Sequence, residues 1–181
     1  MGISRLNEDN QIPLYKYFTS TVSLITSRGE TGRTNVMACE WTMVVCHKPL
    51  LVMSVIHKND LTHEHILASK EFGVNVCSDR QVALVRLAGN TSGRDYDKMS
   101  DPLIAKVLTP ASRINAPMIR GCLLNIECVI EQTLSFQTHT AFIGRAVAVR
   151  YTPERRPLVY HKGRFAHLGE WFPKPDTTNT Q

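Results

Sequence analysis

The amino-acid sequence predicts a mainly β fold with short helices, in which an antiparallel sheet closes into a barrel. Segments with strand patterns outnumber helical ones, and most of them follow one another directly along the chain. Two long alternating segments, residues 122–136 and 140–151, are separated only by a polar link at 137–139, which is typical of a hairpin. A doubly wound parallel sheet needs a helix between successive strands, so the pattern favours the antiparallel barrel.

The first half of the chain supplies two predicted strands and one helix. Residues 20–27 (STVSLITS) alternate and are rich in β-branched side chains, which predicts a strand, and RGETG then predicts a turn. Residues 34–42 form an extended or irregular segment. The apolar run at 49–56 predicts a buried strand, and residues 62–70 fit a short helix.

The middle of the chain continues this pattern. Residues 71–77 (EFGVNVC) predict a strand, and Asp79 is expected to cap a helix over the segment RQVALVRLAG. Residues 91–101 are polar and predict a loop. With the hairpin that follows, these elements make one domain over residues 14–172. It has an N-terminal extension at 1–13 and a flexible tail at 173–181.

Composition and charge limit the classes of protein to which this chain can belong. The chain has 43% hydrophobic and 20% charged residues, and no apolar run approaches the length of a membrane span. Its N-terminal segment is polar, so we expect no secretory signal, no membrane partner and a cytoplasmic location. The net charge is +5, but the basic residues are scattered, so no nucleic-acid partner is expected. The five cysteines are odd in number and lack a C-x-x-C pair, which argues against disulfides and against a metal site.

The stretch SVIHKNDLTHEHI at residues 54–66 places many hydrogen-bonding side chains where a strand passes into a helix. Helix N-termini carry unpaired N–H groups and a partial positive charge, and Lys58 adds a full charge. A phosphate site is therefore one interpretation. The alternative is that Asn59, Asp60 or Thr62 merely caps the helix, and the segment taken alone favours that alternative.

Residues 34–42 (TNVMACEWT) form a second unusual segment, because polar side chains lie between two apolar strands. A backbone of small and polar residues can present N–H and C=O groups to the edge of a flat heterocycle. The alternative is an irregular edge strand, and for Trp41 we favour burial in the core. Nothing nearby in sequence lowers the pKa of Cys39, so this thiol is interpreted as a small wall residue.

Three histidines need separate interpretations. His139 lies at the start of the hairpin's second strand, where a side chain can reach over the mouth of a pocket. A lone histidine is more often structural or solvated, and both interpretations stay open. His63 and His65 are two residues apart and point in different directions on a helix, so they do not share a metal ion.

Taken in order, these segments resemble the flavin reductase-like FMN-binding split-barrel family, and most of all its flavoredoxin branch. The resemblance covers about residues 14–169. It rests on N-x-M-x-x-x-W (35–41), S-V-x-x-K-x-x-x-T-H-E-H-I (54–66), F-x-V-N-V (72–76), S-G-R-D-x-D-K (92–98) and H-x-x-F-I-G (139–144). It implies a six-stranded split barrel, a homodimer and one FMN per subunit near the dimer interface.

The resemblance also implies roles for individual residues. The segment with Asn35, Met37, Ala38, Cys39 and Glu40 would line the isoalloxazine ring, largely through backbone groups. The junction with Ser54, His57, Lys58, Asn59 and Thr62 would hold the FMN phosphate. Ser92 and Lys98 would lie near the cofactor or across the dimer, and His139 would lie beside the reactive face of the flavin. Many members of the family have a small or hydroxyl residue near Ala38–Glu40, and an acid beside a flavin disfavours its anionic reduced form.

The function implied by the resemblance is an FMN-dependent oxidoreductase. It would move electrons from a reduced nicotinamide, NADH or NADPH, through FMN to free flavin, ferric iron or a partner protein. No G-x-G-x-x-G follows a strand, so the nicotinamide is expected to enter the flavin pocket itself. The alternative is a non-enzymatic FMN electron carrier, whose basic charge would help it dock acidic proteins.

Overall fold

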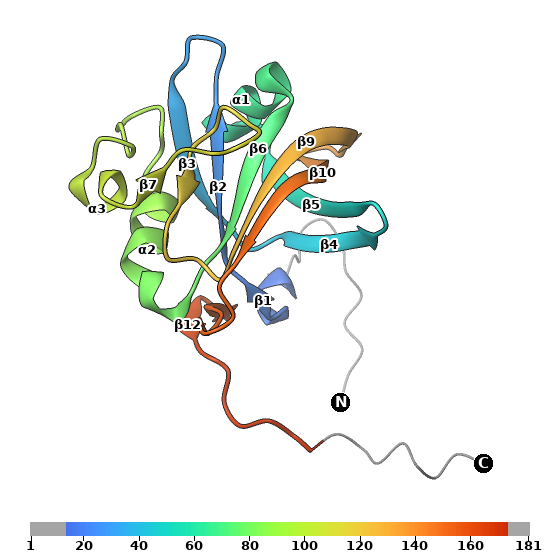
Figure 1. Cartoon of the computed structure of the whole chain (residues 1–181), viewed down its shortest axis with the longest axis vertical. Helices are drawn as coiled ribbons and strands as arrows, with labels where there is room; N and C mark the ends of the chain where they lie inside the picture. Colours follow the sequence, from blue (N-terminus) through green and yellow to red (C-terminus); the bar gives the residue numbers. More distant parts are fainter. Residues whose placement is uncertain (1–13, 174–181) are drawn as a thin grey trace.

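The computed structural model describes residues 14–173, and an antiparallel sheet dominates it (Figure 1). The strands of this sheet are β2 (Ser23–Arg28), β3 (Thr34–Cys39), β4 (Thr42–His47), β5 (Leu50–His57), β6 (Glu71–Val76), β9 (Leu124–Ser135) and β10 (His139–Tyr151). They lie in the order β3-β2-β6-β9-β10-β5-β4, and every neighbouring pair is antiparallel. The predicted mainly β, antiparallel fold is therefore confirmed. The predicted extension at 1–13 and residues 174–181 of the predicted tail lie outside the described residues.

The sheet curls so that one edge approaches strand β5 on the other side. Where β3 ends, the Cys39 thiol donates to the Val55 carbonyl across 3.6 Å, and the Val55 N–H donates to the Trp41 carbonyl across 2.9 Å. These contacts close one end of a barrel. The chain then continues into β4, which lies at the edge of the sheet beyond β5.

The β9–β10 hairpin is the longest element of the sheet, and the sequence predicted both strands. Its register is interrupted between Ile143 and Gly144. A side chain at Gly144 would lie 2.7 Å from both the Phe72 ring and the Cys128 Cβ, so only glycine lets β10 cross the barrel core at this point.

Helices cover two sides of the sheet (Figure 1). They are α1 (Leu61–Ser69), α2 (Val82–Asn90) and α3 (Pro102–Ala105), with single 3₁₀ turns η1 (Leu14–Tyr17) and η2 (Asp79–Gln81). Short strands form two further ladders: β1 (Ser20–Thr21) with β11 (Val159–His161) and β12 (Arg164–Ala166), and β7 (Leu108–Thr109) with β8 (Met118–Ile119). No helix within residues 14–173 is long and apolar enough to cross a bilayer.

Two details of the sequence interpretation are wrong. Asp79 does not cap the helix; Ser78 holds the N-cap position of η2, where it forms a capping box with Gln81. Strand β4 was not predicted, and it raises the main sheet to seven strands where the resemblance implied six.

The two larger of three apolar clusters within the described residues hold these elements together. One fills the barrel and includes Ile25, Phe72 and Phe142, none of which has exposed surface. The other packs α2 against the outer side of β2 and β3 through residues such as Leu24, Val36 and Val85. Helix α2 lies beside the end of β3, and two cavities open there.

Candidate functional site

Two adjoining cavities lie along strand β3. The wide cavity has a volume of about 750 Å³ and the narrow cavity about 400 Å³. Ala38, Gly89 and Asn90 line both, so the two cavities meet where β3 passes α2. An ideal Cβ at Gly89 would lie 3.2 Å from the Ala38 Cβ, so glycine at this position lets α2 approach β3 closely at the junction.

The narrow cavity contains the junction between β5 and α1. Asp60 occupies the N-cap position of α1, but its side chain makes no capping hydrogen bond, and its carbonyl accepts from the N–H groups of His63 and Glu64. Within residues 14–173, the N–H groups of Leu61 and Thr62 donate no hydrogen bond. Capping therefore does not explain the polar junction, and the positive end of the helix faces the cavity with free donors.

Thr62 is fully buried in the wall of this cavity. Its hydroxyl accepts a hydrogen bond of 2.9 Å from the Asn35 side-chain amide, which fixes both side chains. Because the amide supplies the proton of that bond, the proton of the Thr62 hydroxyl is free to be donated to another acceptor. Asn35 and Thr62, predicted from different motifs, are thus in direct contact.

The loop at residues 91–98 covers the narrow cavity. Arg33 donates to the Gly93 carbonyl, and Arg94 donates to the Asn59 carbonyl across 3.3 Å and pairs with Glu64 across 3.1 Å. A Cβ at Gly93 would collide with the side-chain amide of Asn35, so glycine is required where the loop crosses this side chain. These contacts fix the loop, and with it Ser92, over the start of α1.

Lys98 is the lysine that lines the narrow cavity. Only 3% of its surface is exposed, and its ammonium donates to the carbonyls of Ala88 (3.1 Å) and Thr91 (2.9 Å) at the end of α2. Burial lowers the pKa of Lys98 from its ordinary value of 10.5 to about 8, while the Asp60 carboxylate acts in the opposite direction. Because burial makes the protonated form of Lys98 less favourable, an anion that enters the cavity would stabilise that form.

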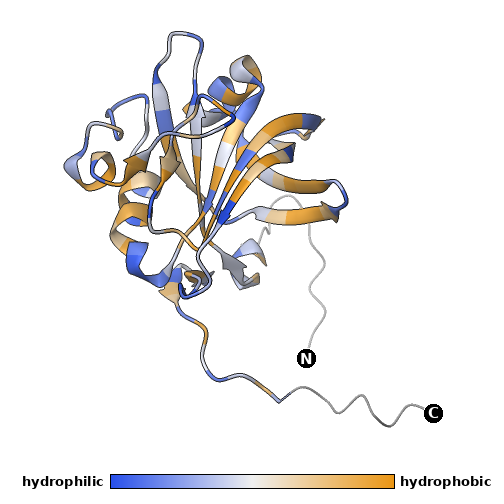
Figure 2. Ribbon diagram, in the orientation of Figure 1, coloured by the Kyte–Doolittle hydropathy of each residue, from blue (hydrophilic) through white to orange (hydrophobic). Residues whose placement is uncertain are grey.

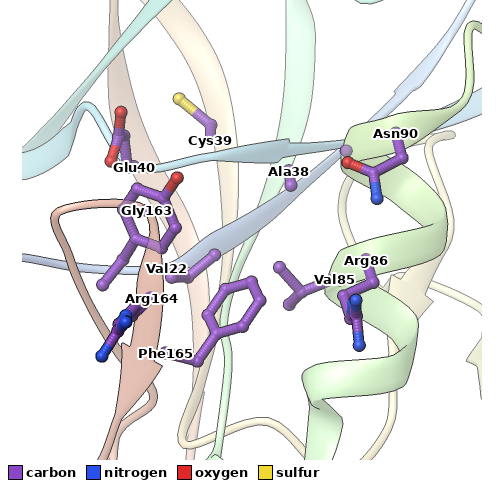
Figure 3. A pocket seen from close by; sticks show the side chains of 12 residues that line it. Val22, Ala38, Cys39, Glu40, Val85, Arg86, Asn90, Gly163, Arg164 and Phe165 are labelled. Atoms are coloured by element: carbon purple, nitrogen blue, oxygen red, sulfur yellow. The ribbon is translucent and has the colours of Figure 1, made fainter. Parts of the chain in front are cut away.

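The wide cavity lies between the end of β3, helix α2 and the hairpin of β11 and β12 (Figure 3). Its wall contains the rings of Tyr160 and Phe165, whose centroids are 5.4 Å apart, and two guanidinium groups, Arg86 and Arg164. In Figure 3 the two arginines lie on opposite sides of the Phe165 ring. Sequence reasoning missed these four residues, because the resemblance assigned roles only in its other motifs.

Cys39 and Glu40 form the end of the wide cavity nearest β4. Burial raises the pKa of the Cys39 thiol, and the Thr42 hydroxyl donates to its sulfur across 3.5 Å. This supports the interpretation of Cys39 as an unreactive wall residue. Partial burial also raises the pKa of the Glu40 carboxyl group. Glu40 is therefore an acid in the cavity wall that becomes protonated at a higher pH than a solvated glutamate does.

Four predicted site residues line neither cavity. Ser54 is fully buried, and its hydroxyl exchanges a hydrogen bond of 3.1 Å with Thr42, so it is not a donor at the junction. Lys58 and His57 also lie outside the two cavities. The remaining predicted residues, Asn35, Met37, Asn59, Thr62, Ser92 and Lys98, line the narrow cavity, and Ala38, Cys39 and Glu40 line the wide one.

His139 is the fourth residue outside the cavities, and it belongs to an aromatic cluster on the surface. Its ring centroid is 5.1 Å from that of Trp41 and 4.9 Å from that of His57. Thr138 shares a hydrogen bond of 2.8 Å with its Nδ1, and burial, followed by the neighbouring His57, lowers the pKa of His139. Trp41 is 40% exposed, so the expectation that it lies in the core is wrong.

Residues 15–169 match the sequence profile of the Flavin reductase like domain. The chain belongs to this family. Among curated proteins, it is 32% identical over 126 residues to an uncharacterised protein of Pyrococcus abyssi, a match that covers 70% of this chain and 71% of the other. It is 27% identical over 149 residues to the NADH-dependent FAD reductase of Streptomyces globisporus, covering 82% and 79% of the two chains.

Solved structures of flavin-related proteins share the fold of this flavin reductase-like chain. An FMN-binding protein from Thermus thermophilus aligns with a TM-score of 0.84 at 24% identity, over 97% of this chain and 100% of the other. A flavoredoxin from Methanosarcina acetivorans aligns with a TM-score of 0.80 at 22% identity, over 98% and 97% of the two chains. The resemblance inferred from the sequence motifs is confirmed. Within residues 14–173, no three metal-ligating side chains converge on a point.

Proposed function

We propose that this chain binds FMN across the two cavities, with the phosphate in the narrow cavity and the isoalloxazine ring in the wide one. The observation that carries the proposal is the set of free donors at the start of α1. The N–H groups of Leu61 and Thr62 have no acceptor within the described residues, and the Thr62 hydroxyl can donate a proton beside them. Donors at a helix N-terminus are suited to a phosphate group.

Lys98 supplies the charge for this phosphate, in place of the Lys58 that the sequence suggested. It lines the same cavity and is buried, so its attraction to an anion is screened less than that of a surface lysine. We propose FMN and not FAD, because the narrow cavity, of about 400 Å³, contains a single set of helix N-terminal donors, which suits one phosphate group. The chain's relatives are consistent with a flavin of either kind, since one of them is an FAD reductase.

The proposed activity is the reduction of this flavin by a reduced nicotinamide. FMN, when bound, supplies the electron-accepting chemistry, and the protein supplies binding and orientation. Arg86 and Arg164 place two positive charges on the wall of the wide cavity, where they would bind the phosphates of the dinucleotide. The electrons would then pass to free flavin, ferric iron or a partner protein.

We also propose that the active unit is a homodimer. Residues Met43, Met53 and Ile143 are paired across β4, β5 and β10, and none of the three is fully buried, so they form an apolar row on one face of the sheet. Figure 2 shows hydrophobic colouring along these strands. Met43 is 58% exposed on the edge strand β4. An apolar edge of this kind is unstable in water unless a second surface covers it, and a second copy would also cover the nearby cluster of His57, Trp41 and His139. We retain His139 as a residue that orients the nicotinamide in a pocket completed by the second copy.

Anaerobic mixing of the flavin-loaded protein with NADH or NADPH tests the proposed activity. Rapid loss of the visible flavin absorbance with either dinucleotide is the expected result, and extraction of the pigment should yield FMN. A protein that neither dinucleotide bleaches, but that a reduced carrier protein bleaches, would instead be an electron carrier. A protein that binds no flavin would contradict the whole assignment.

A further inference from the structure

A third cavity, of about 240 Å³, lies at the other end of α2 and shares no lining residue with the wide and narrow cavities. Four of its lining residues are cationic and come from four separate segments of the chain. These are Arg80 in η2, Lys106 after α3, Arg120 after β8 and Arg155 in the loop before β11. We call this the basic cavity.

No acidic side chain lines the basic cavity. The ion pairs found within residues 14–173 are Arg94 with Glu64 and Arg145 with Glu131, so none of the four cations has a carboxylate partner there. The Asp101 carboxylate, at the start of α3, accepts hydrogen bonds from the Leu103 N–H and the Tyr96 hydroxyl. Four like charges around one cavity repel one another, and an anion between them would remove that repulsion.

Hydrogen bonds hold the segments that carry these cations in place. The Arg120 guanidinium donates to the Lys106 carbonyl across 2.7 Å, and the Arg120 carbonyl accepts from the Gln81 side chain across 3.1 Å. Ser78, which caps η2, donates to the Gly121 carbonyl across 2.9 Å. These hydrogen bonds fix the segments that carry the cations, which lowers the entropy lost when a ligand binds.

The remaining wall is apolar and is formed by side chains such as Leu84, Leu103 and Val107. A volume of 240 Å³ corresponds to about eight water molecules at 30 Å³ each. A flavin or a dinucleotide is therefore too large for it, whereas a compact anion with a short carbon skeleton fits both the size and the mixed lining.

We propose that the basic cavity is a binding site for a compact polyanion, a small phosphate ester or a di- or tricarboxylate, that is separate from the flavin site. The ligand's charged groups would contact the arginine and lysine side chains, and its carbon atoms would lie against the apolar wall. This assignment does not depend on the proposed flavin chemistry, because the two sites share no residue.

Calorimetric titration of the purified full chain with inorganic pyrophosphate and with citrate tests the proposal, at one ionic strength set with sodium chloride. The test variant is Arg80→Gln with Arg155→Gln. The matched control is Arg113→Gln with Arg150→Gln, which removes the same charge from exposed arginines outside the basic cavity. Loss of two charge-assisted contacts should weaken binding by about tenfold or more in the test variant, and the control should bind as the unsubstituted protein does.

Three results would overturn the proposal. The first is the absence of binding of either anion at millimolar concentration. The second is an equal loss in the two double variants, which would mean that only net charge attracts the anion. The third is displacement of bound flavin by pyrophosphate in step with the measured heat, which would place the anion in the narrow cavity. Flavin fluorescence recorded during the titration separates this last result from binding at the basic cavity.

Discussion

Replacing Thr62 by valine tests the phosphate site most directly. Valine keeps the shape of the side chain and removes only the hydroxyl group. That hydroxyl is fully buried, accepts from Asn35 across 2.9 Å, and has its own proton free to donate into the narrow cavity. The substitution should therefore weaken the binding of FMN far more than that of riboflavin, which has no phosphate.

The size of the difference follows from the kind of bond that is lost. A hydrogen bond to a charged group contributes about 1.5–3 kcal/mol, which corresponds to a loss of FMN affinity of roughly 10- to 150-fold. Riboflavin affinity should change by only a small factor. Thr62→Val also leaves the buried Asn35 amide without its acceptor, which should lower the free energy of unfolding by about 1–3 kcal/mol. Urea denaturation of the apo-protein measures that second effect separately.

Fluorescence titration of both flavins into apo-protein measures the two affinities. Thr26→Val is the matched control, because it removes another fully buried hydroxyl that accepts from an asparagine amide, that of Asn75 across 3.3 Å, but that lies outside both cavities. The control should bind both flavins as the unsubstituted protein does. If Thr62→Val weakens FMN and riboflavin equally, the hydroxyl only supports the wall, and the phosphate does not bind at the start of α1.

Three further predictions concern charge and assembly. The pKa of Lys98 is about 8, so its charge is lost above that pH, and FMN affinity should fall there by about tenfold per pH unit. Riboflavin affinity should stay level, and Lys98→Met should remove the pH dependence of FMN binding. Titrations of both flavins across pH measure this. Glu40→Gln should make the flavin midpoint potential more positive, and spectroelectrochemistry should show the difference shrinking as pH falls through the raised pKa of Glu40. Met43→Lys should convert the dimer to a monomer near 20.4 kDa in sedimentation, whereas Leu67→Lys, on the exposed side of α1, should not.

The sequence predicted the elements whose signals are local. Alternation of apolar residues predicted β9 and β10, and the sudden change from an apolar run to polar residues predicted the boundary between β5 and α1. The segment 34–42 was identified as unusual for a valid physical reason, since it contributes Asn35, Met37, Ala38, Cys39 and Glu40 to the walls of the two cavities.

The parts that the sequence did not predict depend on contacts between distant segments. The sequence motifs placed Lys58 at the phosphate and Lys98 only near the cofactor or across the dimer. Only the fold of the 91–98 loop places Lys98 against the end of α2 and into the cavity. Strand β4 was missed because its apolar residues, Met43 to Val45, are exposed in the monomer and show no alternation between a buried and a solvated face. The sequence of such a strand lacks the alternation of apolar and polar residues by which a strand in a single chain is recognised.

The junction between the two cavities explains why the same short segment of β3 serves both halves of the proposed cofactor. Asn35 lies on the side of the narrow cavity, Cys39 lies on the side of the wide one, and Ala38 faces the place where they meet. Opposite Ala38, the backbone of Gly89 on α2 comes close enough that an added Cβ would lie 3.2 Å from the alanine Cβ. A larger side chain at either position would push α2 away from β3, where the two cavities share their wall. An elongated ligand with a charged end and a flat end would cross this shared wall, so binding of FMN across both cavities depends on the close contact between β3 and α2 that Ala38 and Gly89 allow.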